Sequence, residues 1–333
     1  MKKRSYMKIV VTGGSGFIGS NFILNTLQSR KDIEIINIDA EFYGSNPKNL
    51  EDIDGERYEF VKGTITDSKL MKEVISKSDA VINFAAESFV DRSIADASPF
   101  LESNVKGVFT ILEIMKKTKK RFIQVSTDEV FGSLQKGSAI EETRFNPSSP
   151  YAATKAAAEL LVNSYGITFG LDYVITRCTN NFGPRQFPEK LIPKIILLAN
   201  QEKNIPVYGN GANIRDWIYV NDHCNAILNI FEKGESKTSY NISSDNEVDN
   251  LTIIKKILQI MNKSENLISF VEDRPGHDFR YSMKSERIQK ELGWKPKKDF
   301  NEALKNTVEW YLQNESWWRE ISPSFLNSTP WKK

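Results

Sequence analysis

The sequence predicts an α/β fold with a doubly wound parallel sheet and a smaller mixed α/β lobe. Two features of the chain predict it. In the first half, short apolar runs alternate with longer amphipathic ones, as strands and helices do when helices cover both faces of a parallel sheet. After about residue 180 the apolar runs shorten, and prolines and glycines become frequent. We therefore expect one domain over residues 1–180, to which segments around 212–245 return, and a second lobe over 181–333.

The individual elements follow from these runs. Strands are expected at the short apolar runs, at residues 8–12, 33–38, 57–61, 80–84, 121–126 and 173–177. Helices are expected at the amphipathic runs, at residues 17–29, 68–77, 99–118, 151–165, 189–200, 221–233, 250–261 and 300–314. No long linker separates the two parts, so the cleft between them is the natural place for a ligand.

Composition argues against several classes of protein. Forty-five basic and 43 acidic residues give a net charge of +2, whereas binding nucleic-acid phosphates needs a basic surplus. No apolar stretch reaches the ~20 residues that cross a bilayer, and the apolar run near the start is too short for a signal peptide. Two cysteines in 333 residues favour a reducing compartment, so we expect a cytoplasmic protein.

Gly13, Gly16 and Gly19 follow the first expected strand and open the first expected helix. Such glycines allow a tight turn and let the backbone approach a pyrophosphate at the helix N-terminus. Asp39 lies 20 residues after Gly19, where a carboxylate can accept hydrogen bonds from ribose hydroxyls and repel a 2′-phosphate. The loop thus predicts a Rossmann-type domain that binds NAD rather than NADP. The alternative is a structural strand–helix turn with an incidental aspartate.

Tyr151 and Lys155 stand four residues apart at the start of an expected helix, so their side chains share one face. Ser149 and Pro150 suit the cap and first turn of that helix. A nearby ammonium lowers the pKa of a phenol, which makes Tyr151 a candidate base for a hydroxyl group. The alternative is a solvated helix face, because this spacing is common.

Two adjacent carboxyl groups, Asp128 and Glu129, follow the strand expected at 121–126, and ligands of open α/β sheets bind at such strand ends. If one is shielded from water and the other is not, their pKa values separate and provide an acid and a base. The alternative is a loop cap with two exposed acids. His223 and His277 are far apart in sequence and no Cys/His cluster accompanies them, so we expect no metal. Neither Gly-x-Ser-x-Gly nor a Ser/His/Asp set suggests a hydrolase.

These motifs together carry a family resemblance. Residues 12–19, 126–132 and 151–155 resemble the extended short-chain dehydrogenase/reductase group, and the chain is similar nearly end to end to its dTDP-glucose 4,6-dehydratase family. Further strings that carry the resemblance are AAES (85–88), VDRSI (90–94), RCTNN (177–181), FPEKLIP (187–193), IRDW (214–217), DRPGHD (273–278) and WY (310–311). The Thr-Asp-Glu string at 127–129 discriminates most, because epimerases and decarboxylases of the same group generally lack the acidic pair.

The resemblance implies 4,6-dehydration of a nucleoside-diphosphate hexose with resident NAD. Tyr151, helped by Lys155, takes the C4 hydroxyl proton while hydride passes from C4 to NAD. Glu129 removes the C5 proton, Asp128 protonates the departing C6 hydroxyl, and Thr127 holds the C4 oxygen. The hydride then returns to C6, which gives a 4-keto-6-deoxy sugar for a cell-surface polysaccharide or glycoprotein.

The resemblance also implies binding residues and a homodimer formed through the helices at 99–118 and 151–165. The expected NAD site consists of Gly13, Gly16, Phe17, Ile18, Gly19, Asp39, Thr64, Ile65, Phe84, Ala85, Ala86, Ser103, Tyr151, Lys155 and Asn181. The expected nucleotide-sugar site consists of Ser88, Phe89, Thr127, Asn180, Lys190, Leu191, Pro206, Tyr208, Arg215, Asn250, Arg274 and His277. The cations of this second set suit a diphosphate.

The chain departs from the family pattern at several places. Phe89 stands where the family usually has His, beside the sugar site. Thr64 stands where it usually has an Asp that contacts the adenine, and Phe131 stands where it usually has Tyr. Arg185 stands where an aromatic residue is common, and residues 243–245 replace a typical Gly-Gly-His. Phe89 and the 243–245 stretch leave the substrate open between dTDP-glucose, the first expectation, and a UDP-sugar such as UDP-N-acetylglucosamine. A related epimerase or ketosugar enzyme, and a non-catalytic NAD-sensing protein, are the remaining alternatives.

Overall fold

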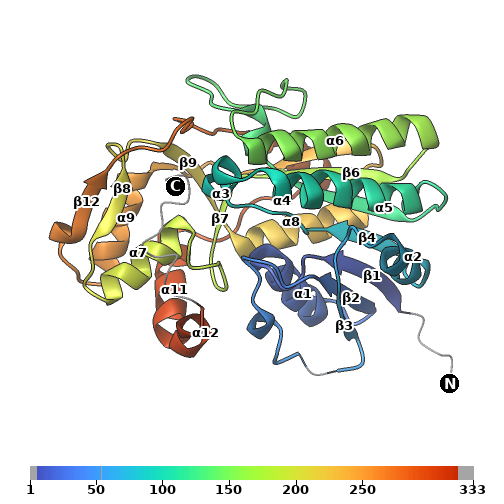
Figure 1. The fold of residues 1–333 in the computed structure, drawn as a ribbon, viewed down its shortest axis with the longest axis horizontal. Coiled ribbons are helices and arrows are strands. Elements are labelled where there is room, and N and C mark those ends of the chain that lie inside the picture. The colour runs from blue at the N-terminus through green and yellow to red at the C-terminus, as the bar shows by residue number, and fades with distance from the viewer. Residues whose placement is uncertain (1–5, 54, 322–333) are drawn as a thin grey trace.

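The computed structural model describes residues 6–53 and 55–321. Its centre is a seven-stranded sheet in the order β10-β6-β5-β4-β1-β2-β3, in which all neighbouring strands are parallel (Figure 1). The strands are β1 (Met7–Thr12), β2 (Ile33–Asp39), β3 (Tyr58–Lys62), β4 (Ala80–Asn83), β5 (Arg121–Thr127), β6 (Tyr173–Cys178) and β10 (Thr238–Ile242). The predicted strands are all present, and six of them follow the Rossmann order 3-2-1-4-5-6, so the predicted fold class is confirmed.

Helices cover both faces of this sheet (Figure 1). One face carries α1 (Phe17–Ser29) and α8 (Val220–Lys233), and the other carries α2 (Ser68–Ser76), α5 (Val108–Met115) and α6 (Pro150–Phe169). The central strands are buried along nearly their whole length, which explains their continuous apolar runs.

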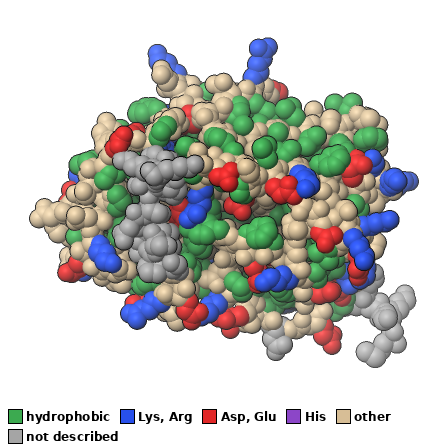
Figure 2. All heavy atoms as spheres, in the orientation of Figure 1, with side chains coloured by type: hydrophobic (Ala, Val, Ile, Leu, Met, Phe, Trp, Pro, Cys, Tyr) green, Lys and Arg blue, Asp and Glu red, His purple; other side chains and the backbone are tan. Residues whose placement is uncertain are grey.

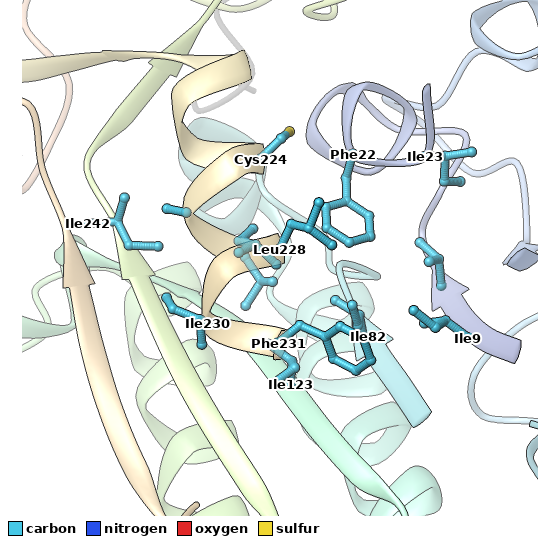
Figure 3. Packing of buried hydrophobic residues seen from close by; sticks show 14 of the residues in the cluster. Ile9, Phe22, Ile23, Ile82, Ile123, Cys224, Leu228, Ile230, Phe231 and Ile242 are labelled. Carbon is cyan, nitrogen blue, oxygen red and sulfur yellow. The ribbon is translucent and has the colours of Figure 1, made fainter. Parts of the chain in front are cut away.

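Figure 3 shows the core beneath α1 and α8. Phe22 of α1 and Phe231 of α8 belong to one buried cluster with Ile9, Ile82 and Ile123 of the sheet. Burying a side chain of this size contributes about 1.5–3 kcal/mol. The cluster therefore fixes α1, and with it the glycine loop, against the sheet.

The second lobe contains two small sheets with helices packed against them. One sheet has the order β11-β9-β7, and the other pairs β8 with β12. Its elements are β7 (Asn180–Phe182), α7 (Leu191–Asn200), β8 (Ile205–Tyr208), β9 (Ile214–Tyr219), β11 (Glu247–Asp249), α9 (Asn250–Ile260), β12 (Ile268–Val271), α11 (Phe300–Gln313) and α12 (Glu315–Arg319). A separate apolar core, with Phe182, Trp217 and Tyr311 among its members, holds this lobe together.

The stretch at 212–245 divides between the two parts of the molecule. Its α8 and β10 pack on the central sheet, whereas β9 pairs within the second lobe. The boundary near residue 180 stays a prediction. Residues 1–5, 54 and 322–333 of the two predicted domains lie outside the described residues. No helix in the described ranges is long and apolar enough to cross a membrane.

The helix predicted at 99–118 is built in three pieces. It opens with α4 (Ser98–Phe100), continues as a π-helical segment, η2 (Leu101–Gly107), and ends as α5. In the π-helical segment, Asn104 hydrogen-bonds the backbone N–H and carbonyl of Glu87. Helical elements that we did not predict are α3 (Val90–Ala95), α10 (Glu286–Leu292), α12, η1 (Pro47–Asn49), η3 (Asp128–Phe131) and η4 (Glu265–Leu267), and the strands β7 to β12 were not placed either.

Candidate active site

A cavity opens at the carboxyl ends of β1, β2, β4, β5 and β6. Every residue predicted to bind NAD lines it, from Gly13 to Asn181, together with the predicted reacting residues Asp128 and Glu129. Of the residues predicted for the nucleotide sugar, the lining includes Ser88, Phe89, Thr127, Asn180 and Lys190. Strand ends that are far apart in the sequence thus bring the predicted NAD site and part of the predicted sugar site together at one edge of the sheet.

The glycine loop lies directly against the end of β4. Gly13 has a φ of +71°, and a Cβ atom there would lie 2.6 Å from the backbone nitrogen of Ala85. A Cβ atom on Gly19 would lie 2.4 Å from the carbonyl oxygen of Gly13. Only glycine fits at either position. No side chain caps α1 at Gly16, so the first N–H groups of the helix can serve phosphate oxygens.

Asp39 is fixed beside this loop. Its Oδ2 accepts a hydrogen bond from the Ser15 backbone at 2.9 Å, and its Oδ1 accepts one from the Glu41 backbone at 2.7 Å. Burial raises the pKa of Asp39, and the two backbone hydrogen bonds oppose that rise. The carboxylate is therefore held in place at the cavity, where hydroxyl groups of a ligand could donate to it.

The start of α6 places Tyr151 and Lys155 in the cavity. The Ser149 hydroxyl caps the helix by accepting from the Ala152 backbone, and Pro150 occupies the first turn, as predicted. Lys155 Nζ donates to the carbonyl of Val125 at 2.7 Å. Burial lowers the pKa of Lys155 to about 8, so the ammonium is retained at neutral pH.

The expected direction of the Tyr151 pKa shift was wrong for the protein alone. Burial raises the pKa of this phenol well above its ordinary value, and the charge of Glu129 raises it further. The Lys155 ammonium is directed to the Val125 carbonyl, and the loss of water around the phenol dominates. Sharing one helix face with a lysine is therefore not sufficient to lower the pKa of Tyr151.

The two adjacent carboxyl groups lie in different surroundings. Asp128 is buried; its Oδ1 accepts from the Thr127 hydroxyl at 3.2 Å, and burial raises its pKa well above the ordinary value. Burial also raises the pKa of Glu129, but three nearby cations favour its charged form: Arg274, Lys190 and Arg215. These surroundings favour protonation of Asp128 over that of Glu129, in the direction that an acid and a base require, and the roles of the two groups stay a prediction.

Several predicted sugar-site residues lie outside the cavity lining. These are Leu191, Pro206, Tyr208, Arg215, Asn250, Arg274 and His277. Leu191 begins α7, Pro206 and Tyr208 lie in β8, and Asn250 begins α9. The structure therefore places these four in the second lobe without bringing them into the lining, and their role stays a prediction.

The departures from the family pattern fall in different places. Phe89 lines the cavity but is itself covered, because it packs edge-on against Tyr43 and Phe187 with ring centroids 5.1 and 5.7 Å apart. The 243–245 stretch lies elsewhere, and the Ser244 hydroxyl donates to Asp216 Oδ1 at 2.7 Å. Of the two departures that leave the substrate open, only Phe89 lines the cavity.

Each of the remaining departures, Phe131, Thr64 and Arg185, makes a contact with a neighbouring side chain. Phe131 is buried beneath the Arg177 guanidinium, which lies 5.1 Å from its ring centroid. Thr64 lines the cavity and hydrogen-bonds the Thr66 hydroxyl at 3.1 Å. Arg185 lies 5.8 Å from the ring centroid of Trp310.

Sequence reasoning missed a contact that joins the loop after β2 to the second lobe. The Arg92 guanidinium lies 3.5 Å from the ring centroid of Tyr43 and donates to Glu189 Oε2 at 2.9 Å. The Tyr43 hydroxyl also donates to Glu189. Arg92 and Glu189 stand inside the VDRSI and FPEKLIP strings, which was the available signal, whereas nothing marked Tyr43.

Comparisons with known proteins agree with this site. The sequence profile described as GDP-mannose 4,6 dehydratase matches residues 10–307. The dTDP-glucose 4,6-dehydratase of Mycobacterium tuberculosis is 42% identical over 95% of this chain and 96% of its own length. A low-salt glycan biosynthesis protein of Haloferax volcanii is 45% identical over 93% of this chain and 100% of its own.

A solved structure extends the likeness to three dimensions. The dTDP-glucose 4,6-dehydratase of Streptomyces venezuelae, crystallised with NAD and a second ligand, superposes with a TM-score of 0.93 at 41% identity. The match covers 95% of this chain and 100% of that one. This chain therefore belongs to the dTDP-glucose 4,6-dehydratase family of the extended short-chain dehydrogenases/reductases.

Proposed function

We propose that this protein is a cytoplasmic, NAD-dependent nucleoside-diphosphate-hexose 4,6-dehydratase whose substrate is dTDP-glucose. The observation that carries the proposal is the meeting of Tyr151, Asp128 and Glu129 in the cavity that also contains the glycine loop. Asp128, whose pKa is strongly raised, suits proton donation, and Glu129, faced by cations, suits proton acceptance. This separated acid and base favour dehydration over epimerisation or cofactor sensing.

The cavity fits NAD. The glycine loop and the uncapped N-terminus of α1 suit a pyrophosphate, and Asp39 suits ribose hydroxyls. Several buried polar atoms of the lining have no partner among the described residues: Ser126 Oγ, Asp128 Oδ2, Thr179 Oγ1 and Asn180 Oδ1. Buried polar groups are seldom left unpaired, so this lining suits a polar ligand. NAD supplies the uptake and return of a hydride when bound.

The side chains of this protein carry out the proton transfers of the reaction. Tyr151 takes the proton of the C4 hydroxyl in its phenolate form and becomes a neutral phenol, and the Lys155 ammonium, fixed on Val125, favours that phenolate. Glu129 takes the C5 proton while Asp128 protonates the C6 hydroxyl as it leaves. These roles follow the burial and charge of each group, since burial raises the pKa of Asp128 and so favours its neutral form.

Two observations bear on the identity of the substrate, and they support different sugars. Relatives named for dTDP-glucose are about as similar to this chain as any that we compared, which supports dTDP-glucose. Phe89, an apolar ring in the cavity lining where the family usually has His, supports the alternative of a 2-acetamido sugar carried on UDP. Both substrates require the same acid, base and phenol.

Mass spectrometry of the reaction products tests the proposal. The purified protein is incubated separately with dTDP-glucose, UDP-glucose and UDP-N-acetylglucosamine, without added NAD. We expect dTDP-glucose to lose the mass of one water, because the cofactor is carried by the protein. Water loss from UDP-N-acetylglucosamine alone would move the substrate to the alternative. No change in any sugar, in protein shown to contain NAD, would contradict the assigned reaction.

We also propose a homodimer formed by α5, α6 and the π-helical segment η2. Large apolar side chains are exposed there: Leu101, Phe109, Leu160, Ile167 and Phe169. Leu160 and Ile167 of α6 are 59% and 78% exposed. Figure 2 shows green hydrophobic side chains over the upper right of the molecule, where α5 and α6 lie in Figure 1. Exposed apolar side chains gathered on neighbouring helices suit a protein partner, and a second copy of the chain would cover them symmetrically.

Replacing Leu160 and Ile167 together by Glu should convert the dimer to a monomer. Two carboxylates in each half of the interface would have to be buried unpaired, which is costly. Light scattering coupled to size exclusion measures the mass. Phe270→Glu, at another exposed apolar side chain, on β12 of the second lobe, is the control and should stay dimeric. A monomeric parent protein at all concentrations would exclude this assembly.

A further inference from the structure

A buried tyrosine outside the cavity lining contacts Glu129. Tyr281 is 3% exposed and is not part of the cavity lining, whereas Glu129 is. The Tyr281 hydroxyl lies 3.4 Å from Glu129 Oε2 and donates to Asp278 Oδ2 at 2.6 Å. Glu129 therefore both lines the cavity and contacts a phenol that is hydrogen-bonded to a second carboxylate.

The contacts continue from Asp278 to the surface. Asp278 is buried, and the same Oδ2 atom accepts a hydrogen bond from the Ser148 hydroxyl. Ser148 is exposed and immediately precedes the cap of α6. Groups that can each accept and donate a proton thus connect Glu129 to solvent through protein interior.

Positive and polar groups hold this chain of contacts in place. The Arg215 guanidinium lies 4.3 Å from the ring centroid of Tyr281 and donates to the Asp278 carbonyl at 2.9 Å. Asn213 Nδ2 donates to the same carbonyl at 3.2 Å. The phenol and its carboxylate partner therefore have fixed positions relative to Glu129.

We infer that Tyr281, Asp278 and Ser148 form a proton route between Glu129 and solvent, an inference that rests on the proposed function. When the C5–H bond breaks, the proton passes to Glu129. Glu129 gives it to the Tyr281 oxygen as Tyr281 passes its own proton to the Asp278 carboxylate, and Asp278 releases one to water at Ser148. Tyr281 ends neutral, and no group changes oxidation state. The reverse sequence brings a solvent proton back to Glu129 and then to C5.

This route matters because a bound sugar covers the cavity side of Glu129. Without a second connection, the proton removed from C5 stays on Glu129 and returns to the same carbon. With the route, the Glu129 proton exchanges with solvent during each turnover. The hydrogen at C5 of the product therefore reports whether Tyr281 is used.

The experiment is turnover in heavy water. Product is collected early, its deuterium at C5 is measured by NMR, and isolated product kept in heavy water corrects for exchange after release. We expect deuterium at C5 in most product from the parent protein. Tyr281→Phe should lower that fraction by about tenfold or more, because positioned proton transfer accelerates a step by roughly 10²-fold or more. A slower step after C5 deprotonation leaves more time for exchange and raises the fraction, so a slower enzyme does not by itself produce the expected fall.

Two further variants separate a proton route from a structural role. Tyr240→Phe is the matched control, since Tyr240 is also buried and donates to a carboxylate, Glu291, at 2.8 Å. It should keep the parental deuterium fraction. Asp278→Asn can still accept from Tyr281 but cannot carry the proton onward, so it should lower the fraction as Tyr281→Phe does.

The outcomes distinguish this inference from the proposed function. If the parent protein removes no water, the proposed function fails before the route is tested. If it removes water and Tyr281→Phe and Asp278→Asn keep the parental deuterium fraction, the route is wrong while the function stands.

Discussion

Replacing Asp128 by Asn and Glu129 by Gln in one protein abolishes water loss while NAD and the nucleotide sugar still bind. Each residue transfers one proton in the proposed reaction, and removing a positioned acid or base costs about 10²–10⁴-fold. The amides have nearly the same size as the acids, and an Asn at position 128 can still accept from the Thr127 hydroxyl. The change therefore removes proton transfer and leaves the shape of the cavity.

The double variant is most informative about the reaction step at which turnover stops. Oxidation at C4 depends on Tyr151 and not on the acid pair, so reduced nicotinamide absorbance should accumulate on mixing with sugar. Asp245→Asn with Glu142→Gln is the matched control, because both acids are exposed and lie outside the cavity lining. Release of a 4-keto-6-deoxy sugar by the Asp128/Glu129 variant at the parental rate would mean that the acid and the base are elsewhere.

The fold and the cofactor half of the site were predictable because they depend on local rules. Alternating strands and helices give a parallel sheet, and its carboxyl ends meet at one edge whatever the exact packing. Gly13 and Asp39 are recognisable since a tight loop and a strand end each require particular residue types. The π-helical segment at 101–107 was not recognisable, because its amphipathic spacing resembles that of an α-helix.

The rest of the site depends on contacts between distant parts of the chain. The pKa of Tyr151 is set by how much water the folded protein removes from the phenol, which helix spacing does not reveal. Tyr281 acquires its position beside Glu129, 152 residues earlier, only when the second lobe packs. The family resemblance likewise implied that Pro206 and Asn250 bind the sugar, whereas the structure keeps them outside the cavity lining.

Tyr151→Phe stops the reaction one step earlier than the acid-pair variant. The substitution retains the buried ring and its edge-on contact with Phe100, whose centroid is 6.3 Å away, so we expect a folded protein that still binds NAD. It removes the only group proposed to take the C4 proton, so turnover should fall by about 10²–10⁴-fold. No reduced nicotinamide absorbance should appear on mixing with sugar, in contrast to the acid-pair variant.

Tyr165→Phe provides the matched control for that experiment. Tyr165 lies on the same helix, α6, is also buried, and donates to Glu113 outside the cavity lining, so its loss should leave turnover near the parental value. The two stopping points together order the steps, because oxidation at C4 must precede removal of the C5 proton if the 4-keto group is what acidifies it. Accumulation of reduced nicotinamide in Tyr151→Phe would overturn the role of Tyr151 and not that order, since the C4 proton would then have left without its proposed base.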